Sequence, residues 1–511
     1  MKKRRRLLAL VLALALCAGC HDTSQEGQTE TNDLGGTGET WETAATVPGQ
    51  KTAIALAYSP SDSLNPFQVT TEYNYYLIPL VYEGLFRIND QFQAENLLCE
   101  SYSNEGNQWE FQIKQGVLFH DGQELTARDV VYSIQQAQSS TCFAVRSQNI
   151  ASCTASGRYT LRIRLNSADS RLPLLLTMPI VQRNTGAEDH PPGTGRYVVE
   201  DVDGTVTLRA NESWHGGRVP ITEIRLSALY QDSELSYVVG SGVIDAVCFE
   251  KPFATTSPIR GTFDVSTFPT TDLHYLGVNK NNRYLQDPLV RQAISAALDR
   301  ELLVQKAFSG YADATLLPVN PVFADYGITA ADPDALLRQA GCTDTDGDGI
   351  YNYTDGTNIV LNLLVPQEDE MKQQAASIVA QSLLGSGIQV QVQALPAEQF
   401  QQEVAADRFD LFYGETRMDD AFDLSEMVFS GGSLCYGGGD EQVAQAMTNV
   451  KNAAQDQVDA AREQLYQVFS QQMPIIPMAY GRGCVVTGKD VMNPVQAASR
   501  DPYYNIHEWA S

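Results

Sequence analysis

The sequence predicts a mixed α/β protein that is divided into two or three lobes. The chain has 511 residues, which is more than one hydrophobic core usually organises. Hydrophobic residues make up 43% of it, so there is enough apolar surface to build substantial cores. From Lys51 onward, short apolar runs alternate with segments of helical period, which is the pattern of mixed lobes.

The N-terminus predicts a secretory signal peptide over residues 1–19. Residues 2–6 are all basic, and the apolar run 7–16 that follows is too short to span a bilayer. The next four residues, Cys-Ala-Gly-Cys, resemble a lipobox that has Cys17 where Leu is usual. We therefore expect Cys20 to be lipidated and to become the new N-terminus. Cleavage as an ordinary signal peptide is the alternative.

Residues 20–50 are expected to form a flexible tether. This segment is rich in Thr, Glu, Gly, Ser and Gln and has almost no aliphatic side chains, so it cannot collapse into a core. No stretch after it approaches the length of apolar sequence that crosses a membrane. A lipid anchor at Cys20 would therefore hold the following body near a membrane surface without fixing its orientation.

The charge balance excludes some partners. Asp and Glu number 62 against 35 Lys and Arg, for a net charge of −27, and the only basic run lies in the predicted signal peptide. A chain this acidic repels phosphate backbones and anionic lipid headgroups. Nucleic acids and basic docking on membranes are therefore poor hypotheses.

The first elements of the body follow from local patterns. Residues 52–58 predict a strand, 64–66 a turn, and 77–86 an apolar helix. Residues 109–113 alternate with period two, and together with 117–119 they predict a β-hairpin.

A helix is predicted to begin after Thr126. Asp129, three residues further on, completes a capping box in which Asp replaces the usual Glu, and Val130 and Val131 are expected to face inward. The preceding segment 120–122 reads His-Asp-Gly. This His and Asp are candidates for a catalytic pair, but no nucleophile or third metal ligand lies nearby, so stabilisation of a turn is the favoured interpretation.

Two further patterns leave alternatives open. Cys142 and Cys153 are spaced so that a disulfide could bridge a loop, while the seven cysteines that follow the predicted signal segment show no spacing typical of zinc sites. Asp344, Asp346 and Asp348 imitate the spacing of a calcium loop with Asp355 at its twelfth position, but the bidentate Glu is absent. A calcium loop and a plain Asp-Gly turn both remain possible.

A family resemblance emerges from motifs spread over residues 51–490. The signature segment is Val117–Ser133, preceded by residues 81–90 and 109–111. Further similarities follow in order at 193–197 (GTGRY), 208–211 (LRAN), 214–217 (WHGG), 242–245 (GVID), 287–294 (DPLVRQAI), 299–301 (DRE), 336–341 (LLRQAG), 346–349 (DGDG) and 474–477 (PIIP). In these motifs and their order the chain resembles the bacterial extracellular solute-binding proteins of family 5, which serve peptide and nickel ABC importers.

The resemblance implies a periplasmic-binding-protein-like clamp of two lobes with an extra third domain, built from mixed sheets flanked by helices. Domain I would be discontinuous and comprise residues 51–80, 190–271 and 481–511. Domain II would comprise residues 81–189, and domain III residues 272–480. Because the chain crosses between the lobes at least twice, closure about a hinge is mechanically plausible.

The resemblance also implies a ligand site in the cleft between the lobes. In peptide-binding members a carboxylate in a Trp-x-x-Asp-Tyr segment holds the α-ammonium group of the ligand, and Asp420 falls on that position. Arg417 replaces the Trp and Ala421 the Tyr, so Arg417 could pair with Asp419 or Asp420, or meet an anionic ligand group. A solvated acidic loop is the alternative. The expected ligand-binding residues are Thr70, Glu72, Tyr73, Tyr413, Gly414, Arg417, Asp419 and Asp420.

Aromatic residues that follow the turn at 64–66 extend this expectation. Tyr73, Tyr75 and Tyr76 could offer pockets for ligand side chains, with packing inside the lobe as the alternative. No His lies in residues 413–440, so a metal cargo of the nickel type is disfavoured.

The sequence therefore predicts a non-enzymatic binding protein without a cofactor or a resident metal. It would be a monomer, anchored by lipid on the extracytoplasmic face of the cell membrane, that captures short peptides and delivers them to an ABC permease and its ATPase subunits. The alternative is a non-peptide solute such as a glycoside, an opine or a metal chelate. A secreted hydrolase lacks support because no Gly-x-Ser-x-Gly or His-Glu-x-x-His motif is present. A surface adhesin or signalling receptor remains open.

Overall fold

The computed structural model describes residues 52–202, 205–230, 241–252, 263–488 and 495–509. The predicted signal peptide, Cys20 and the predicted tether lie outside these residues. Within the described segments, none of the helices combines the length and the hydrophobicity that crossing a membrane requires.

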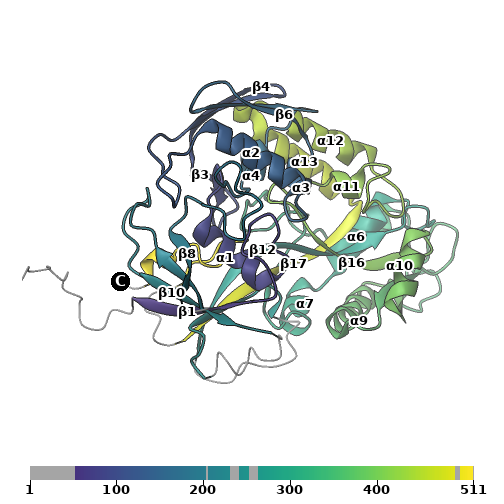
Figure 1. Ribbon diagram of the computed structural model, residues 1–511. Helices are drawn as coiled ribbons and strands as arrows, with labels where there is room; N and C mark the ends of the chain where they lie inside the picture. The colour runs from purple at the N-terminus through teal and green to yellow at the C-terminus, as the bar shows by residue number, and fades with distance from the viewer. Residues whose placement is uncertain (1–51, 203–204, 231–240, 253–262, 489–494, 510–511) are drawn as a thin grey trace, which may run out of the picture. The chain divides into compact units, whose positions relative to one another are not determined.

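A large mixed sheet runs through the body (Figure 1). Its described part has 11 strands, and the hydrogen-bonded order is β15-β14-β16-β12-β17-β11-β1-β10-β9-β8, with β13 also paired to β17. In chain order these strands are β1 (Ala53–Tyr58), β8 (Tyr197–Val202), β9 (Thr205–Ala210), β10 (Glu223–Ala228), β11 (Ala246–Phe249), β12 (Phe263–Val278), β13 (Ala312–Ala314), β14 (Val360–Pro366), β15 (Gln389–Leu395), β16 (Leu411–Arg417) and β17 (Ile475–Gly488).

Two smaller sheets complete the strands. One has the order β4-β5-β7-β6, and the other pairs β2 with β3. Their bounds are β2 (Phe86–Ile88), β3 (Ala94–Asn96), β4 (Cys99–Glu105), β5 (Gln108–Ile113), β6 (Ile150–Ala155) and β7 (Thr160–Leu165).

The helices lie between the strands in sequence. They are α1 (Glu72–Val81), α2 (Ala127–Gln138), α3 (Ala144–Ser147), α4 (Leu172–Leu175), α6 (Pro288–Ala297), α7 (Arg300–Lys306), α8 (Pro333–Gln339), α9 (Glu370–Gly385), α10 (Ala397–Ala405), α11 (Ser425–Val428), α12 (Glu441–Asn452) and α13 (Val458–Gln472). An Asp side chain caps the N-terminus of α6, α7, α8, α9 and α12 by accepting a hydrogen bond from a backbone N–H. Such caps satisfy donors that the helix itself leaves free.

Two hydrophobic cores meet along β12 and β17. The first core draws almost all its residues from 273–480, and the second draws mainly on 54–248 and 495–509. Both long strands enter both cores, because Phe268 and Val485 belong to the second core while Leu273 and Tyr480 belong to the first. The ladder between β12 and β17 is interrupted by register shifts between these halves. A bulge of this kind bends and twists a strand locally.

The local predictions have mixed outcomes. The strand over 52–58 is confirmed as β1, whereas the helix predicted over 77–86 is displaced: α1 ends at Val81, and Phe86 already begins β2. The predicted hairpin is wrong, since β5 pairs with β4 and β7 and not with residues 117–119. The chain turns tightly at Gly106, where φ is positive, so the true partner of β5 precedes it.

The start of α2 is confirmed in detail. The Asp129 carboxylate accepts hydrogen bonds from the Thr126 N–H at 2.9 Å and from the Thr126 hydroxyl at 2.5 Å. Val130 is fully buried, and Val131 is partly buried. The capping interaction predicted from sequence therefore forms.

The His120-Asp121 pair has a structural role. Asp121 accepts hydrogen bonds from the Gln123 N–H at 3.0 Å and from Gln182 Nε2 at 2.8 Å. His120 Nδ1 accepts from the Gly193 N–H at 3.3 Å, and burial lowers the pKa of His120. These contacts match the turn that was favoured over a catalytic pair.

Candidate functional site

The predicted ligand-binding residues come from three places around β12. Glu72 and Tyr73 lie on α1, with Thr70 just before it; Tyr413, Gly414 and Arg417 lie on β16; and Asp419 and Asp420 follow in the next turn. β16 pairs with the half of β12 that belongs to the first core, while α1 contributes to the second core. The predicted residues therefore lie on both sides of the junction between the cores.

Arg417 bridges this junction. Its guanidinium forms ion pairs with Glu250 and, at 3.2 Å, with Asp272 of β12. Partial burial by itself would lower the pKa of Arg417, but Glu250 and Asp272 raise it overall. The partners are therefore not Asp419 or Asp420, which were the alternatives from sequence.

Glu72 belongs to the same charged group. Burial and the neighbouring Glu250 raise the pKa of its carboxyl group, while a hydrogen bond from Tyr76 at 3.0 Å and the charge of Arg417 oppose that shift. The carboxylates of Glu72, Glu250 and Asp272 thus share the guanidinium of Arg417 between α1 and β16.

A second charged group lies beside β16. Lys372 of α9 pairs with Glu415 at 2.7 Å, and Lys251 pairs with the same carboxylate. Burial alone would raise the pKa of Glu415, but His274, Lys372 and Lys251 lower it to about 2. Glu415 therefore stays ionised between two lysines.

Tyr413 and Gly414 lie in a tightly packed part of β16. The Tyr413 hydroxyl lies 3.2 Å from Nδ1 of His274, and burial lowers the pKa of His274 to about 4. A Cβ atom at position 414 would lie 2.3 Å from Cζ of the Tyr275 ring. The cross-strand partner of Gly414 therefore leaves no room for a side chain.

Asp420 is the most buried of the predicted residues, with 1% of its surface exposed. Oδ1 accepts a hydrogen bond from Nε of Arg500 at 3.0 Å, and Oδ2 lies 3.7 Å from Nη2 of Arg146. Burial would lower the pKa of Arg500, but Asp420 and Tyr75 raise it overall. This burial contradicts the alternative of a solvated acidic loop.

The remaining predicted residues serve local structure. Asp419 accepts backbone hydrogen bonds from Ala421 at 3.1 Å and Asp423 at 2.9 Å, and burial raises the pKa of its carboxyl group. The Thr70 hydroxyl donates to Asp62 at 2.9 Å. Tyr73 packs against a small cluster on β1, β11 and β17. Their predicted roles in ligand binding stay predictions.

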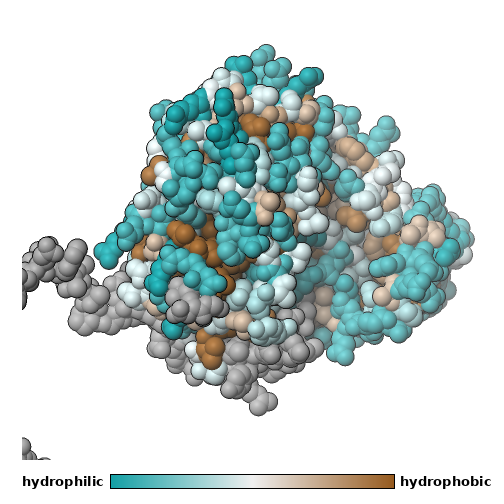
Figure 2. Space-filling view, in the orientation of Figure 1, coloured by the Kyte–Doolittle hydropathy of each residue, from teal (hydrophilic) through white to brown (hydrophobic). Residues whose placement is uncertain are grey.

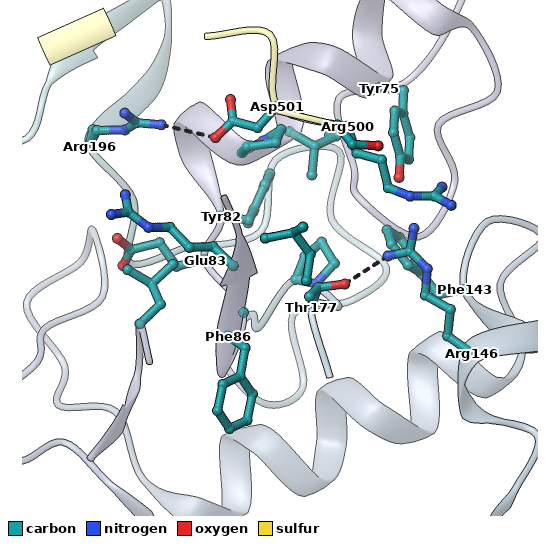
Figure 3. A pocket seen from close by; sticks show the side chains of 18 of the residues that line it. Tyr75, Tyr82, Glu83, Phe86, Phe143, Arg146, Thr177, Arg196, Arg500 and Asp501 are labelled. Carbon is teal, nitrogen blue, oxygen red and sulfur yellow. Dashed lines mark hydrogen bonds and ion pairs between the residues drawn. The ribbon is translucent and has the colours of Figure 1, made fainter. Parts of the chain in front are cut away.

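A cavity of about 100 Å³ is lined in part by Arg146 and Arg500, the two arginines that face Asp420 (Figure 3). Tyr75, Phe143, Arg146 and Arg500 lie on one side of it in this view, whereas Glu83 and Arg196 lie on the other. Tyr75 stacks on Phe143 with ring centroids 6.4 Å apart. The complete lining is Tyr75, Ile78, Pro79, Tyr82, Glu83, Gly84, Phe86, Arg87, Ile88, Leu97, Phe143, Arg146, Thr177, Pro179, Arg196, Trp214, Ser499, Arg500 and Asp501.

Most of this cavity was not foreseen from sequence. Of the three tyrosines considered, Tyr75 lines it, while Tyr76 is buried in the second core. Arg146 and Arg500 stand in segments without any recognisable motif, and only tertiary contacts bring them to Asp420. Arg196 did carry a signal, because it occupies the position of a usual Pro in the GTGRY motif.

The other open patterns have different outcomes. All seven cysteines in the described segments are free, so no disulfide joins Cys142 and Cys153 in this structure. The carboxylates of Asp344, Asp346 and Asp348 lie within 4.8 Å of one another on an exposed loop. Asp355 instead pairs with Arg283 at 2.7 Å. The carboxylate at the twelfth position of the calcium-loop pattern is therefore paired with an arginine side chain of the protein.

The structure thus has two cores joined by long strands, with charged groups at their junction. Comparison with known sequences identifies its family. The family profile described as "Bacterial extracellular solute-binding proteins, family 5 Middle" matches residues 93–433, which is more than half of the chain. The chain belongs to the bacterial extracellular solute-binding proteins of family 5, and this membership places it on the extracytoplasmic side.

Individual relatives agree with the family assignment. The oligopeptide-binding protein AppA of Bacillus subtilis (strain 168) is 23% identical over 553 aligned residues, covering 100% of this chain and 99% of AppA. The glutathione-binding protein GsiB of Shigella flexneri is 24% identical over 379 residues, covering 69% and 71% of the two chains. A crystal structure described as a nickel ABC transporter from Bacillus halodurans superposes with a TM-score of 0.74 at 20% identity and covers 89% of this chain and 98% of its own. The last match confirms the predicted clamp-type fold.

Proposed function

We propose that this protein is the substrate-binding component of an ABC importer, which captures short peptides at the junction of its two cores and delivers them to a membrane permease. The observation that carries the proposal is the junction itself. Charged side chains of the first core, Arg417 and Asp420, meet partners from the other side of the junction, Glu250 and Arg500. The similarity to a peptide-binding relative over the whole chain supports a peptide as the solute.

The long strands supply a mechanism for capture. β12 and β17 connect the cores, and their pairing is irregular between Pro269 and Leu273. Rotation at this point would separate the cores and expose the charged groups. A solute that contacts both sides then favours the closed arrangement by its difference in affinity for the two states. No covalent step is required, so the protein acts as a receptor and not as an enzyme.

The domain division and the anchor remain proposals. Domain III, residues 272–480, coincides with the segment that supplies nearly all of the first core. Domains I and II would share the second core.

Lipidation of Cys20, followed by the tether of residues 20–50, would keep a monomeric receptor close to its permease. We expect the wild-type protein to be found in the membrane fraction of cells and the Cys20→Ser variant to be lost from it.

Asp420 is proposed to bind the α-ammonium group of the peptide. In the structure its carboxylate is held by Arg500 and Arg146, so an ammonium group would compete with Arg500 for Oδ1. Asp420 is almost fully buried and already has arginine partners, so only a positively charged ligand group that replaces Arg500 can bind its carboxylate without leaving a buried charge unpaired.

Calorimetry with Ala-Ala-Ala and its N-acetylated form tests this proposal. Asp420→Asn keeps the size of the side chain and should weaken binding of the free-amine peptide by roughly tenfold or more, because a hydrogen bond between charged groups is lost. Binding of the acetylated peptide should change little. The matched control is Asp459→Asn, whose side chain is 98% exposed. Equal losses for both peptides would refute the assigned role.

A non-peptide solute is the second candidate. Arg417 occupies the position of the Trp in the peptide-binding motif, and four arginines line the cavity beside Asp420. A thermal-shift panel of peptides, glycosides, opines and metal chelates separates the two candidates, because only a bound solute raises the unfolding temperature. Stabilisation by another class, with no effect of any peptide, would replace the peptide proposal.

A further inference from the structure

The cavity beside Asp420 has a cationic end. Arg146 of α3 and Arg500 of the C-terminal segment both face Asp420, next to the stacked rings of Tyr75 and Phe143 (Figure 3). The volume of about 100 Å³ is enough for several water molecules or for one small group of a ligand.

Arg146 has an unused hydrogen-bond donor at this end. Only 9% of its side chain is exposed. Nη1 donates to the Thr177 hydroxyl at 2.9 Å, and the guanidinium lies over the ring of Phe143 at 5.5 Å. Nη2 is buried and finds no hydrogen-bond partner among the described residues, because Asp420 Oδ2 is 3.7 Å away. A buried charged donor without a partner is destabilising, so this atom is suited to a ligand acceptor.

The charge at this end is also incompletely balanced. Asp420 is shared between two guanidinium groups, and Arg500 makes the closer contact at 3.0 Å. One carboxylate therefore serves two cations in a mostly buried setting. The surplus positive charge favours an additional anionic group.

The other carboxylates around the cavity face cations or donors other than Arg146. Asp501 lies 3.7 Å from Arg196, with its Oδ1 buried and without a hydrogen-bond partner among the described residues, and Glu95, just outside the lining, pairs with Arg87 at 2.8 Å. Glu83, on the far side in Figure 3, lies within hydrogen-bond distance of three side chains. These three are Thr194, Trp214 and His215. None of these acids is paired with Arg146 in the described part of the chain.

We propose that this cavity is a subsite for a carboxylate group of the bound solute, held by Arg146 with Arg500, so that the protein selects solutes with an acidic group. The proposal deepens the proposed function and rests on solute binding at the junction. The planar guanidinium fork matches a carboxylate, and the aromatic walls accept the carbon atoms that carry it. When a ligand ammonium group takes the place of Arg500 at Asp420 Oδ1, the released guanidinium of Arg500 can turn to the ligand carboxylate, while Arg146 stays beside Oδ2.

Two matched ligand pairs test the wild-type protein. Calorimetry compares Glu-Ala-Ala with Gln-Ala-Ala, both amidated at the C-terminus, so that they have nearly the same shape and differ only in the side-chain carboxylate. Thermal unfolding compares glutarate with glutaramide, which differ in the same way and are not peptides. We expect Glu-Ala-Ala to bind roughly tenfold tighter or more, and glutarate to raise the unfolding temperature more than glutaramide.

Variants then locate the effect. Arg146→Met should abolish the preference for the acidic member of each pair while retaining binding of Gln-Ala-Ala, and Arg146→Lys should keep part of it. The control is Arg162→Met on β7, whose side chain is 65% exposed. If Arg146→Met does not fold, the wild-type comparisons and Arg146→Lys decide the matter.

The outcomes separate the two proposals. Equal affinity of wild type for Glu-Ala-Ala and Gln-Ala-Ala would overturn the subsite while leaving peptide capture intact. A preference that survives in Arg146→Met would overturn it as well. If neither tripeptide binds, the peptide cargo is refuted, and the subsite then stands or falls with the difference between glutarate and glutaramide.

Discussion

Removing the carboxylate of Asp420 should destabilise the folded protein strongly. Asp420→Ala leaves Arg146 and Arg500 facing each other without the anion that now lies between them. Breaking a buried ion pair by deleting one partner typically costs about 3–5 kcal/mol. The Arg500 side chain is 21% exposed and can be partly hydrated, so we expect the lower end, about 3 kcal/mol.

Urea unfolding followed by circular dichroism measures this loss. The comparison variant is Asp459→Ala, whose side chain is 98% exposed beside Arg462 and whose loss should cost less than about 1 kcal/mol. Because a protein with two cores can unfold in more than one step, the transition of each core is fitted separately.

A second substitution isolates the charge. Adding Arg500→Met to Asp420→Ala removes one of the two stranded cations, so the double variant should recover part of the lost stability. A loss below about 1 kcal/mol for Asp420→Ala, or no recovery in the double variant, would show that this ion pair does not form as described.

Three further predictions concern β16 and the cysteines. Gly414→Ala places a methyl group 2.3 Å from the ring of Tyr275 and should lower the free energy of unfolding by about 1–3 kcal/mol in urea titrations. The pKa of Glu415 is lowered from 4.5 to about 2, so its stabilising contribution is fully present above pH 4.5 and lost as the pH falls towards 2; Glu415→Gln should flatten this part of the pH profile of unfolding. Cys142 and Cys153 are free, so iodoacetamide should label both in denaturant without a reductant, as read by peptide mass mapping.

Each of these predictions has an internal check. Gly385→Ala is the control for Gly414→Ala, since nothing lies within 4 Å of an added Cβ there and Ala favours a helix. An unshifted acid limb in Glu415→Gln, or labelling of Cys142 and Cys153 only after reduction, would contradict the corresponding prediction.

The surface agrees with a receptor that is exposed to solvent. The face seen in Figure 2 is largely covered by hydrophilic side chains, and its hydrophobic side chains gather in small separate groups. The high net negative charge favours the solubility of such a receptor at the extracytoplasmic side.

Local sequence determined those features that depend on neighbouring residues. The strand β1 and the capping contact between Thr126 and Asp129 follow from short-range patterns, and both are present. The hairpin predicted at 109–119 is wrong because a short segment does not show which strands it will pair with. One partner of β5 is β7, more than 40 residues away, and the other is the strand just before it, across the turn at Gly106.

The candidate site also shows what local sequence cannot predict. The sequence by itself determined the family, the acidic character of the chain and the choice of Asp420 as a candidate ligand-binding residue. Only the tertiary structure decided that Asp420 faces Arg146 and Arg500, which lie far from it in sequence. The reason is physical: a motif records which side chains a short segment supplies, whereas the charge that each one meets in a buried setting is set by how distant segments pack together.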